Sequence, residues 1–240
     1  MTIIPVDTVA STNDYLKELE KQVFAEGTVI VTRDQTAGKG QRGNSWESEA
    51  GKNITCSILL YPSFLPVQRF FLLSEAIALG VKETLDVYTD GITIKWPNDV
   101  YYQDCKIAGI LIENELTGNA YSMSIAGIGL NVNQEHFLSN APNPVSLKQI
   151  TGRKHYIEAL LRELIQNVLD RYEQLKAGDA ESIIRMYHEA LYRKAGFHRY
   201  EDSEGIFNAR IDRVSDNGFL HLVTDRNEER SYAFKAVRFL

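Results

Sequence analysis

The chain has 240 residues, enough for one large domain or for one domain with a small second unit. Its 44% hydrophobic and 24% charged residues are typical of a globular protein, and its net charge of −6 argues against a general nucleic-acid binder without excluding a local basic patch. No apolar run approaches the ~20 residues that span a bilayer, and residues 1–7 lack the features of a secretory signal. We therefore expect a cytoplasmic protein without a membrane partner.

The cysteines and histidines do not predict a metal site. Cys56 and Cys105 lie in strand-like segments without CxxC or Cys/His spacing, which predicts reduced thiols in a cytoplasmic protein. The five histidines are scattered without ligand spacing, so we expect no structural metal.

Apolar periodicity defines the elements of the first half of the chain. In order, we predict a short amphipathic helix, a strand, a second strand with apolar residues at alternate positions, and a largely apolar helix, at 12–24, 28–32, 54–60 and 66–88. Ser11 is placed to cap the first helix. Residues 33–51 have no period of their own, and a loop of this length inside a compact domain is usually functional or disordered.

The second half begins with strands, continues with helices and ends with strands. The predicted elements are strands at 91–95, 106–115 and 121–130, helices at 154–175 and 180–193, and short strands at 206–214, 218–223 and 230–238. We expect a mixed α/β domain over residues 1–190 and a small all-β domain over residues 191–240.

The sequence K-W-P-N-D at residues 95–99 follows a hydrophobic strand, and Lys106 comes seven residues after Asp99. We expect the strand that returns from this turn to carry Lys106 and Gly109. Two lysines and an aspartate beside an apolar sheet suggest a substrate with anionic and apolar parts. Taken alone, the segment also fits an ordinary hairpin with a proline turn and solvated charges.

The glycine-rich loop at residues 38–43 formally matches G-x-G-x-x-G. A dinucleotide site requires the first glycine at a strand end and a helix at the last one, whereas the strand at 28–32 ends too early and a polar segment follows Gly43. The other sequence motifs of protein kinases are absent, and the loop does not have the Walker sequence, since no Gly-Lys-Ser/Thr follows.

The same loop is suited to binding anions by another route. Lys39 and Arg42 alternate with glycines whose free N–H groups and conformational freedom allow the loop to order over a phosphate and a carboxylate. Trp46 offers a flat face for a nucleobase. The alternative is a solvated loop that Trp46 anchors to the core.

Four segments together resemble the biotin–protein ligases: S-T-N at 11–13, Q-T-A-G-K-G-Q-R-G-N-S-W at 35–46, K-W-P-N-D at 95–99 with Lys106, and G-I-G-L-N-V-N at 127–133. The resemblance covers essentially the whole chain in order and spacing; the glycine loop and K-W-P-N-D are specific, and the other two segments are weak alone. It implies an α+β fold with a mixed, mostly antiparallel sheet flanked by helices, as in class II aminoacyl-tRNA synthetases and biotin ligases, and a small all-β C-terminal domain.

The resemblance also implies a two-step reaction. The biotin carboxylate attacks the α-phosphate of MgATP to give biotinyl-5′-AMP and pyrophosphate, and a lysine of a biotin carboxyl carrier protein then displaces AMP. Biotin and ATP are the substrates, Mg²⁺ is required with ATP, and no cofactor is permanently bound. Members of this type are monomers or homodimers, and some carry an N-terminal DNA-binding domain; because the signature here starts by Ser11, we expect the enzyme without the repressor and no DNA partner.

By resemblance, the catalytic residues are Lys106, Lys39 and Asp99. Lys106 would contact the biotin carboxylate and the α-phosphate, where a fixed cation lowers the barrier most, and Lys39 would assist from the loop. Asp99 would orient or deprotonate the acceptor lysine, or serve only as a hydrogen-bonding residue of its turn. The expected biotin-binding residues are Ser11, Thr12, Asn13, Gln35, Gly38, Lys39, Gly40, Lys106, Gly109 and Leu111. The expected ATP- or adenylate-binding residues are Lys39, Gln41, Arg42, Asn44, Trp46, Lys95, Asn98 and Asn131.

Some assignments and departures stay open. Ser11 fits both a helix cap and a ligand contact, and Asn131 equally fits a turn residue that ends its strand. Many members carry arginine at the positions of Gln41 and Asn44, and we hypothesise that Arg42 supplies the missing charge. The rival functions are a lipoate–protein ligase and a non-catalytic biotin or adenylate sensor; intact Lys106, Lys39 and Asp99 argue against the sensor.

Overall fold

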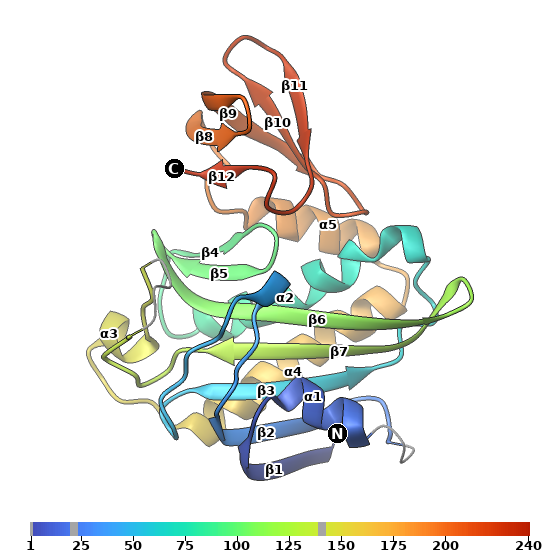
Figure 1. Ribbon diagram of the computed structural model, residues 1–240, viewed down its shortest axis with the longest axis vertical. Helices are drawn as coiled ribbons and strands as arrows, with labels where there is room; N and C mark the ends of the chain where they lie inside the picture. The colour runs from blue at the N-terminus through green and yellow to red at the C-terminus, as the bar shows by residue number, and fades with distance from the viewer. Residues whose placement is uncertain (1, 20–23, 139–142) are drawn as a thin grey trace.

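The protein is described here by a computed structural model that covers residues 2–19, 24–138 and 143–240, without the side chain of Arg42 (Figure 1). A seven-stranded sheet has the order β1-β2-β3-β7-β6-β5-β4. β1 and β2 are parallel and every other neighbouring pair is antiparallel, which confirms the mixed, mostly antiparallel sheet. The strands are β1 (Thr2–Val9), β2 (Thr28–Gln35), β3 (Ile54–Leu60), β4 (Ile92–Lys95), β5 (Asp99–Tyr102), β6 (Cys105–Thr117) and β7 (Ala120–Leu130).

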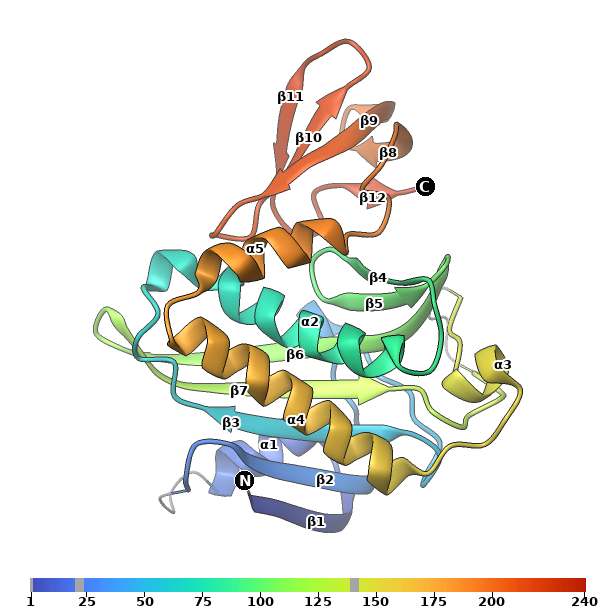
Figure 2. The same cartoon turned by 180° about the vertical axis from the view of Figure 1, so that it is seen from behind.

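Helices cover both faces of this sheet. α2 (Phe71–Asp86) and α4 (Ile157–Lys176) cross the face seen in Figure 2, whereas α1 (Thr12–Leu19) lies on the opposite face, in front in Figure 1. β3 supplies both cores because its side chains alternate: Ile54, Cys56, Ile58 and Leu60 belong to the cluster on the side of α2 and α4, and Leu59 packs with Leu16 of α1. Two further helices are α3 (Leu147–Thr151) and α5 (Ala180–Glu189).

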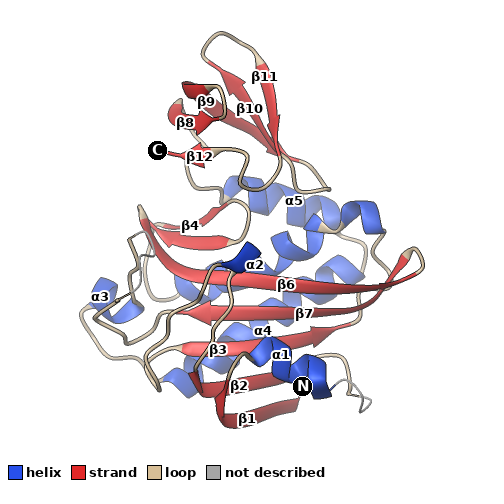
Figure 3. Cartoon of the chain, in the orientation of Figure 1, coloured by secondary structure: helices blue, strands red, loops and turns tan. Residues whose placement is uncertain are grey.

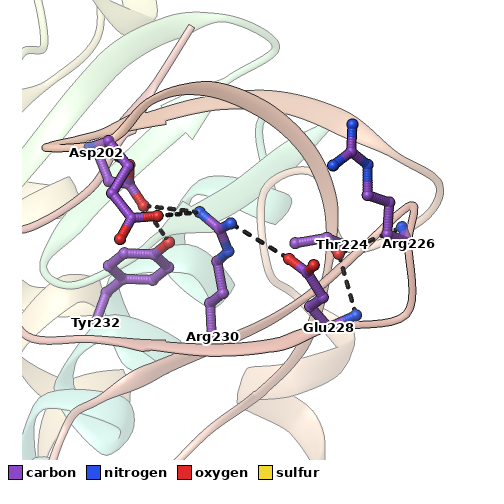
Figure 4. A network of polar contacts seen from close by, with 7 residues as sticks. Asp202, Thr224, Arg226, Glu228, Arg230 and Tyr232 are labelled. Atoms are coloured by element: carbon purple, nitrogen blue, oxygen red, sulfur yellow. Dashed lines mark hydrogen bonds and ion pairs between the residues drawn. The ribbon is translucent and has the colours of Figure 1, made fainter.

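A second sheet, of order β11-β10-β9-β8-β12, follows α5 and forms a separate group of strands in Figure 3. Its strands are β8 (His198–Asp202), β9 (Gly205–Val214), β10 (Leu220–Thr224), β11 (Glu229–Tyr232) and β12 (Arg238–Phe239). Polar contacts near two of its turns tie these strands together (Figure 4). Asp202 accepts hydrogen bonds from Tyr232 at 2.6 Å and from Arg230 at 3.2 Å, while Thr224 accepts the backbone N–H of Glu228.

Turns of the C-terminal sheet contact the K-W-P-N-D turn and the segment before α2. The indole N–H of Trp96 donates to the carbonyl of Gly218 at 3.0 Å, and its ring packs edge-on against Phe234. Arg69 pairs with Asp216 at 2.6 Å. These contacts hold C-terminal residues beside the motif, and the division into domains 1–190 and 191–240 stays a prediction.

Several elements differ from the sequence prediction. β1, β5, α3 and β8 were not predicted, because they are short or, for β1, an edge strand with exposed positions and a proline. The single strand predicted at 230–238 is divided by a turn into β11 and β12. The strand that returns after K-W-P-N-D is the short β5, and Lys106 lies on the next strand, β6, so the expectation that the returning strand carries Lys106 was wrong.

The first helix and the strand after it also have different bounds. α1 extends to Leu19, and the rest of the predicted helix lies partly outside the described residues. β2 runs to Gln35, beyond the predicted end at residue 32. The dinucleotide pattern is nonetheless not met, since Gly43 leads through an irregular segment and a turn at residues 50–52 to the antiparallel strand β3 and not into a helix. None of the helices in the described part of the chain is long and apolar enough to cross a membrane.

Candidate active site

A cavity of about 600 Å³ opens on the α1 side of the large sheet. Its wall includes most of the residues predicted for the site, namely Ser11, Thr12, Asn13, Gln35, Lys39, Gly40, Gln41, Asn44, Trp46, Lys95, Asn98, Asp99, Lys106, Gly109 and Leu111. Gly38 and Asn131 are not part of that wall, and the side chain of Arg42 lies outside the described structure. Segments up to 100 residues apart in the chain therefore meet in one place, as the motif order predicted.

Glycines on β6 and β7 form the floor of this cavity. A Cβ at Gly129 would lie 2.2 Å from Cε2 of Trp46, and one at Gly127 would lie 2.4 Å from Oδ1 of Asn13. A Cβ at Gly109 would lie 3.0 Å from Cζ3 of Trp46. The glycines thus let side chains above the sheet approach its backbone, which gives the G-x-G segment at the end of β7 a steric role.

Buried polar groups form one end of the cavity, at the start of α1. Ser11, Thr12 and Asn13 are at most 4% exposed. The backbone N–H of Thr12 donates to Oε1 of Gln35 at 2.9 Å, and the hydroxyl of Ser57 on β3 contacts Thr12 and Asn13 at 2.7 and 2.5 Å. Ser57 was not predicted, because one serine in an apolar strand gives no sequence signal.

Ser11 supports the first turn of α1 only weakly. Its Oγ lies 3.5 Å from the backbone N of Asp14, at the limit of hydrogen bonding, so its hydroxyl hydrogen remains available. The cap and the ligand contact proposed for Ser11 are therefore compatible.

Lys106 and Asp99 form an ion pair in the cavity wall. Nζ of Lys106 is 2.7 Å from Oδ1 of Asp99, and the two side chains are 22% and 23% exposed. The ammonium also lies 5.6 Å from the centre of the Trp46 ring, within cation–π range. The backbone of Lys106 is held from the other side, because its N–H donates to Asn143 and its carbonyl accepts from Val145.

The glycine loop forms a small hairpin over the cavity. The N–H of Trp46 donates to Gly38 at 2.9 Å and that of Gly40 donates to Asn44 at 2.7 Å. Lys39, on this hairpin, pairs with Asp14 of α1 at 2.6 Å. Its hydrogen bond to Asp14 raises the pKa of Lys39, which keeps the side chain cationic. Gly38 is required by the fold of the hairpin, since a Cβ there would lie 2.4 Å from the carbonyl oxygen of Trp46.

Aromatic rings surround Lys95 at the side of the cavity near the second sheet. Its Nζ donates to the hydroxyl of Tyr101 at 3.1 Å and lies 4.6 Å from the centre of that ring. The rings of Phe239 and Tyr192 lie 5.3 and 5.7 Å away. Burial lowers the pKa of Lys95. Phe239 belongs to β12, so the second sheet contributes directly to this part of the wall.

Asn98 and Asn131 have clear structural contacts. The side chain of Asn98 donates to the carbonyl of Ile110 at 2.7 Å and fixes the turn against β6. Asn131 is 2% exposed and donates to Val145 at 3.1 Å, which holds the segment that binds the Lys106 backbone. Its Oδ1 is buried without a hydrogen-bond partner among the described residues. These contacts favour the turn role for Asn131, and its contact with adenine stays a prediction.

β12 and the segment that precedes it add wall residues that the motifs did not indicate: Phe234, Lys235, Val237, Arg238 and Phe239. Sequence reasoning missed them because they lie about 100 residues after the last recognisable motif and form no recognisable motif themselves. The complete cavity therefore joins a buried hydrogen-bonding end, a central lysine–aspartate pair and a cationic rim. This arrangement fits a ligand with a polar head, an anionic reacting group and a polyphosphate.

Comparison with known proteins gives a consistent result. The chain is 28% identical over 236 residues to the bifunctional ligase/repressor BirA of Bacillus subtilis, covering 95% of this chain and 71% of that protein. It is 31% identical over 176 residues to the biotin–[acetyl-CoA-carboxylase] ligase of Mycobacterium tuberculosis, covering 68% of this chain and 64% of that one.

The fold agrees with the sequence comparison. The structure of biotin protein ligase from Aquifex aeolicus in complex with biotin and ATP is similar, with a TM-score of 0.80 at 23% identity over 100% of this chain and 99% of that one. Residues 6–133, more than half of the chain, match the biotin/lipoate A/B protein ligase family. The chain therefore belongs to the biotin/lipoate A/B protein ligase family.

Proposed function

We propose that this protein is a biotin–protein ligase that forms biotinyl-5′-AMP from biotin and MgATP and then transfers biotin to a lysine of a biotin carboxyl carrier protein. The observation that carries the proposal is the cavity in which the buried polar end at Thr12 and the ammonium of Lys106 share one wall. A ligand that hydrogen-bonds at the first point presents its carboxylate near the second. The relatives reported above support biotin as that ligand.

Lys106 is the main electrostatic group of the first step. A carboxylate and a triphosphate repel each other, and a fixed cation between them stabilises the charge that develops on the transferring oxygens. Asp99 and the backbone contacts at Asn143 and Val145 position this ammonium before substrates bind. Lys39 reaches the same cavity from the hairpin and adds a second cation.

The nucleotide lies in this proposal between the hairpin and the second sheet. Trp46 and Lys95 line that part of the wall, with Gln41, Asn44 and Asn98 beside them. Mg²⁺ enters with ATP as part of the substrate, since this ion is usually bound through phosphates and one or two carboxylates. In the second step Asp99 accepts a proton from the acceptor lysine, and its partial exposure leaves it within reach of an incoming amine.

The partner of the second step is a carrier domain of a biotin-dependent carboxylase. We place the reaction in the cytoplasm, with no part for a membrane or for DNA, and the protein acts as a monomer or a homodimer. A DNA-binding assay and sedimentation of the purified protein test the last two points.

Biotin-dependent exchange of labelled pyrophosphate into ATP tests the first step. The proposal predicts exchange with biotin and none with lipoate. Exchange with lipoate alone would assign the protein to lipoate–protein ligases. Biotin binding without exchange would indicate a sensor.

A further inference from the structure

A chain of hydrogen bonds runs from the partly exposed Glu113 on β6 to the buried polar end of the cavity. Nδ2 of Asn13 donates to Oε2 of Glu113 at 2.7 Å. Oδ1 of Asn13 lies 2.5 Å from the hydroxyl of Ser57, which in turn lies 2.7 Å from the hydroxyl of Thr12. Asn13 and Ser57 are 3% and 0% exposed, so water does not compete for the contacts of Ser57 with Asn13 and Thr12.

The direction of each hydrogen bond follows from the acceptor at the far end. Nδ2 of Asn13 faces the carboxylate of Glu113 and, at 3.4 Å, the carbonyl of Leu111, and both of these groups accept only. The amide orientation is thereby fixed, and Oδ1 of Asn13 must accept from Ser57. Since a hydroxyl has one hydrogen, Ser57 cannot also donate to Thr12.

Thr12 therefore donates its hydrogen to Ser57 and presents lone pairs to the cavity. The competing acceptor, Oε1 of Gln35, has a second lone pair free besides the one that accepts the backbone N–H of Thr12, but its contact with the Thr12 hydroxyl is longer, at 3.2 Å against 2.7 Å for Ser57. The orientation of a hydroxyl on the cavity wall is thus determined by a carboxylate on another strand.

We propose that Glu113 is a positioning residue that makes Thr12 a hydrogen-bond acceptor for a ring N–H of the ureido group of biotin. The proposal rests on the function proposed above and adds a residue that does not itself line the described cavity wall. A ureido N–H can only donate, so a Thr12 hydroxyl with its hydrogen turned toward the cavity would oppose it.

Two variants at Glu113 separate the hydrogen bond from the charge. Glu113→Gln keeps an acceptor for Asn13 but removes the charge, which otherwise also acts on Lys39. Glu113→Leu removes both. The matched control is Glu115→Leu, two residues along the same strand, where the carboxylate pairs with Lys17 at 3.1 Å and is 35% exposed.

The dissociation constant of biotin, measured by calorimetry on the full chain, tests the proposal. Glu113→Leu and Ser57→Ala should each weaken biotin binding roughly tenfold, the effect of one mismatched buried hydrogen bond. Glu113→Gln and Glu115→Leu should stay within about twofold. When Ser57 is already replaced by alanine, adding Glu113→Leu should weaken biotin binding by less than about twofold further, because the series of hydrogen bonds is already interrupted.

A loss of biotin affinity without a change in the KM for ATP distinguishes a positioning role of Glu113 from a general disruption of the fold. The KM for ATP at saturating biotin should be unchanged in Glu113→Leu. Unchanged biotin affinity in Glu113→Leu or in Ser57→Ala would overturn the proposal. Additive losses of affinity in the double variant, or a Glu113→Gln variant that binds biotin as weakly as Glu113→Leu, would overturn it as well. If the unmodified protein itself fails to bind biotin, the proposed function fails instead.

Discussion

Replacement of Lys106 by methionine separates catalysis from stability. Lys106 is paired with Asp99 at 2.7 Å, but both side chains remain more than 20% exposed, so solvent compensates the aspartate when its partner is lost. Pairs of this kind contribute about 0–1 kcal/mol to folding, which for a chain of this length corresponds to a shift of at most ~2–4 °C in Tm. Loss of a well-placed catalytic charge instead costs about 10²–10³ in rate, or roughly 2.7–4 kcal/mol.

The assay is biotin-dependent pyrophosphate exchange, run beside thermal unfolding of the same samples. Lys82→Met is the matched control, since Lys82 pairs with Asp86 at 2.6 Å and is 21% exposed, close to the 22% of Lys106. We expect similar small changes in Tm for both variants and a large loss of exchange for Lys106→Met alone. Equal activity in the two variants, or a loss that follows unfolding, would refute the role of Lys106.

The buried Glu75, the crowded Gly129 and Arg42 of the glycine loop each allow a further test. Burial, with Asp216 nearby, raises the pKa of Glu75 from 4.5 to about 8; the folded state therefore holds a proton that the unfolded state releases, and stability should fall by roughly 4–5 kcal/mol as the pH rises from about 4.5 to about 8. Denaturant unfolding across this range should show the slope, and Glu75→Gln should flatten it. Gly129→Ala should displace the indole of Trp46, 2.2 Å from the new Cβ, lowering stability by about 1–3 kcal/mol and changing tryptophan fluorescence; an unaltered spectrum would contradict this packing. Arg42→Ala should release biotinyl-5′-AMP faster in a filter-retention assay, and unchanged retention would show that Arg42 does not replace the missing loop arginine.

Motif residues were predictable because the reaction constrains their identity and spacing. Lys106, Asp99 and the glycine loop do meet on one wall, as expected from K-W-P-N-D and the G-x-G segments. Two long helices were also predicted, the largely apolar α2 and the periodic α4, although α2 begins at Phe71, five residues after its predicted start, and α4 begins three residues after its own. In these cases local sequence and tertiary packing favour the same structure.

The remaining features depend on tertiary contacts that leave no local pattern. Ser57 is one polar residue in an apolar strand, and its role appears only when α1 lies above it. Phe239 reaches the cavity because the second sheet folds back, about 130 residues after Lys106. β1 pairs at the sheet edge with β2, although its exposed positions and Pro5 weaken the strand signal.

The most direct test of the proposed function is the complete reaction on a carrier domain. The purified protein would be incubated with biotin, MgATP and an isolated biotin carboxyl carrier domain, and the mass of the intact carrier would then be measured by mass spectrometry. We expect one biotinyl adduct on the acceptor lysine, dependent on ATP and abolished when that lysine is replaced by arginine. An unmodified carrier, or modification only when lipoate replaces biotin, would contradict it.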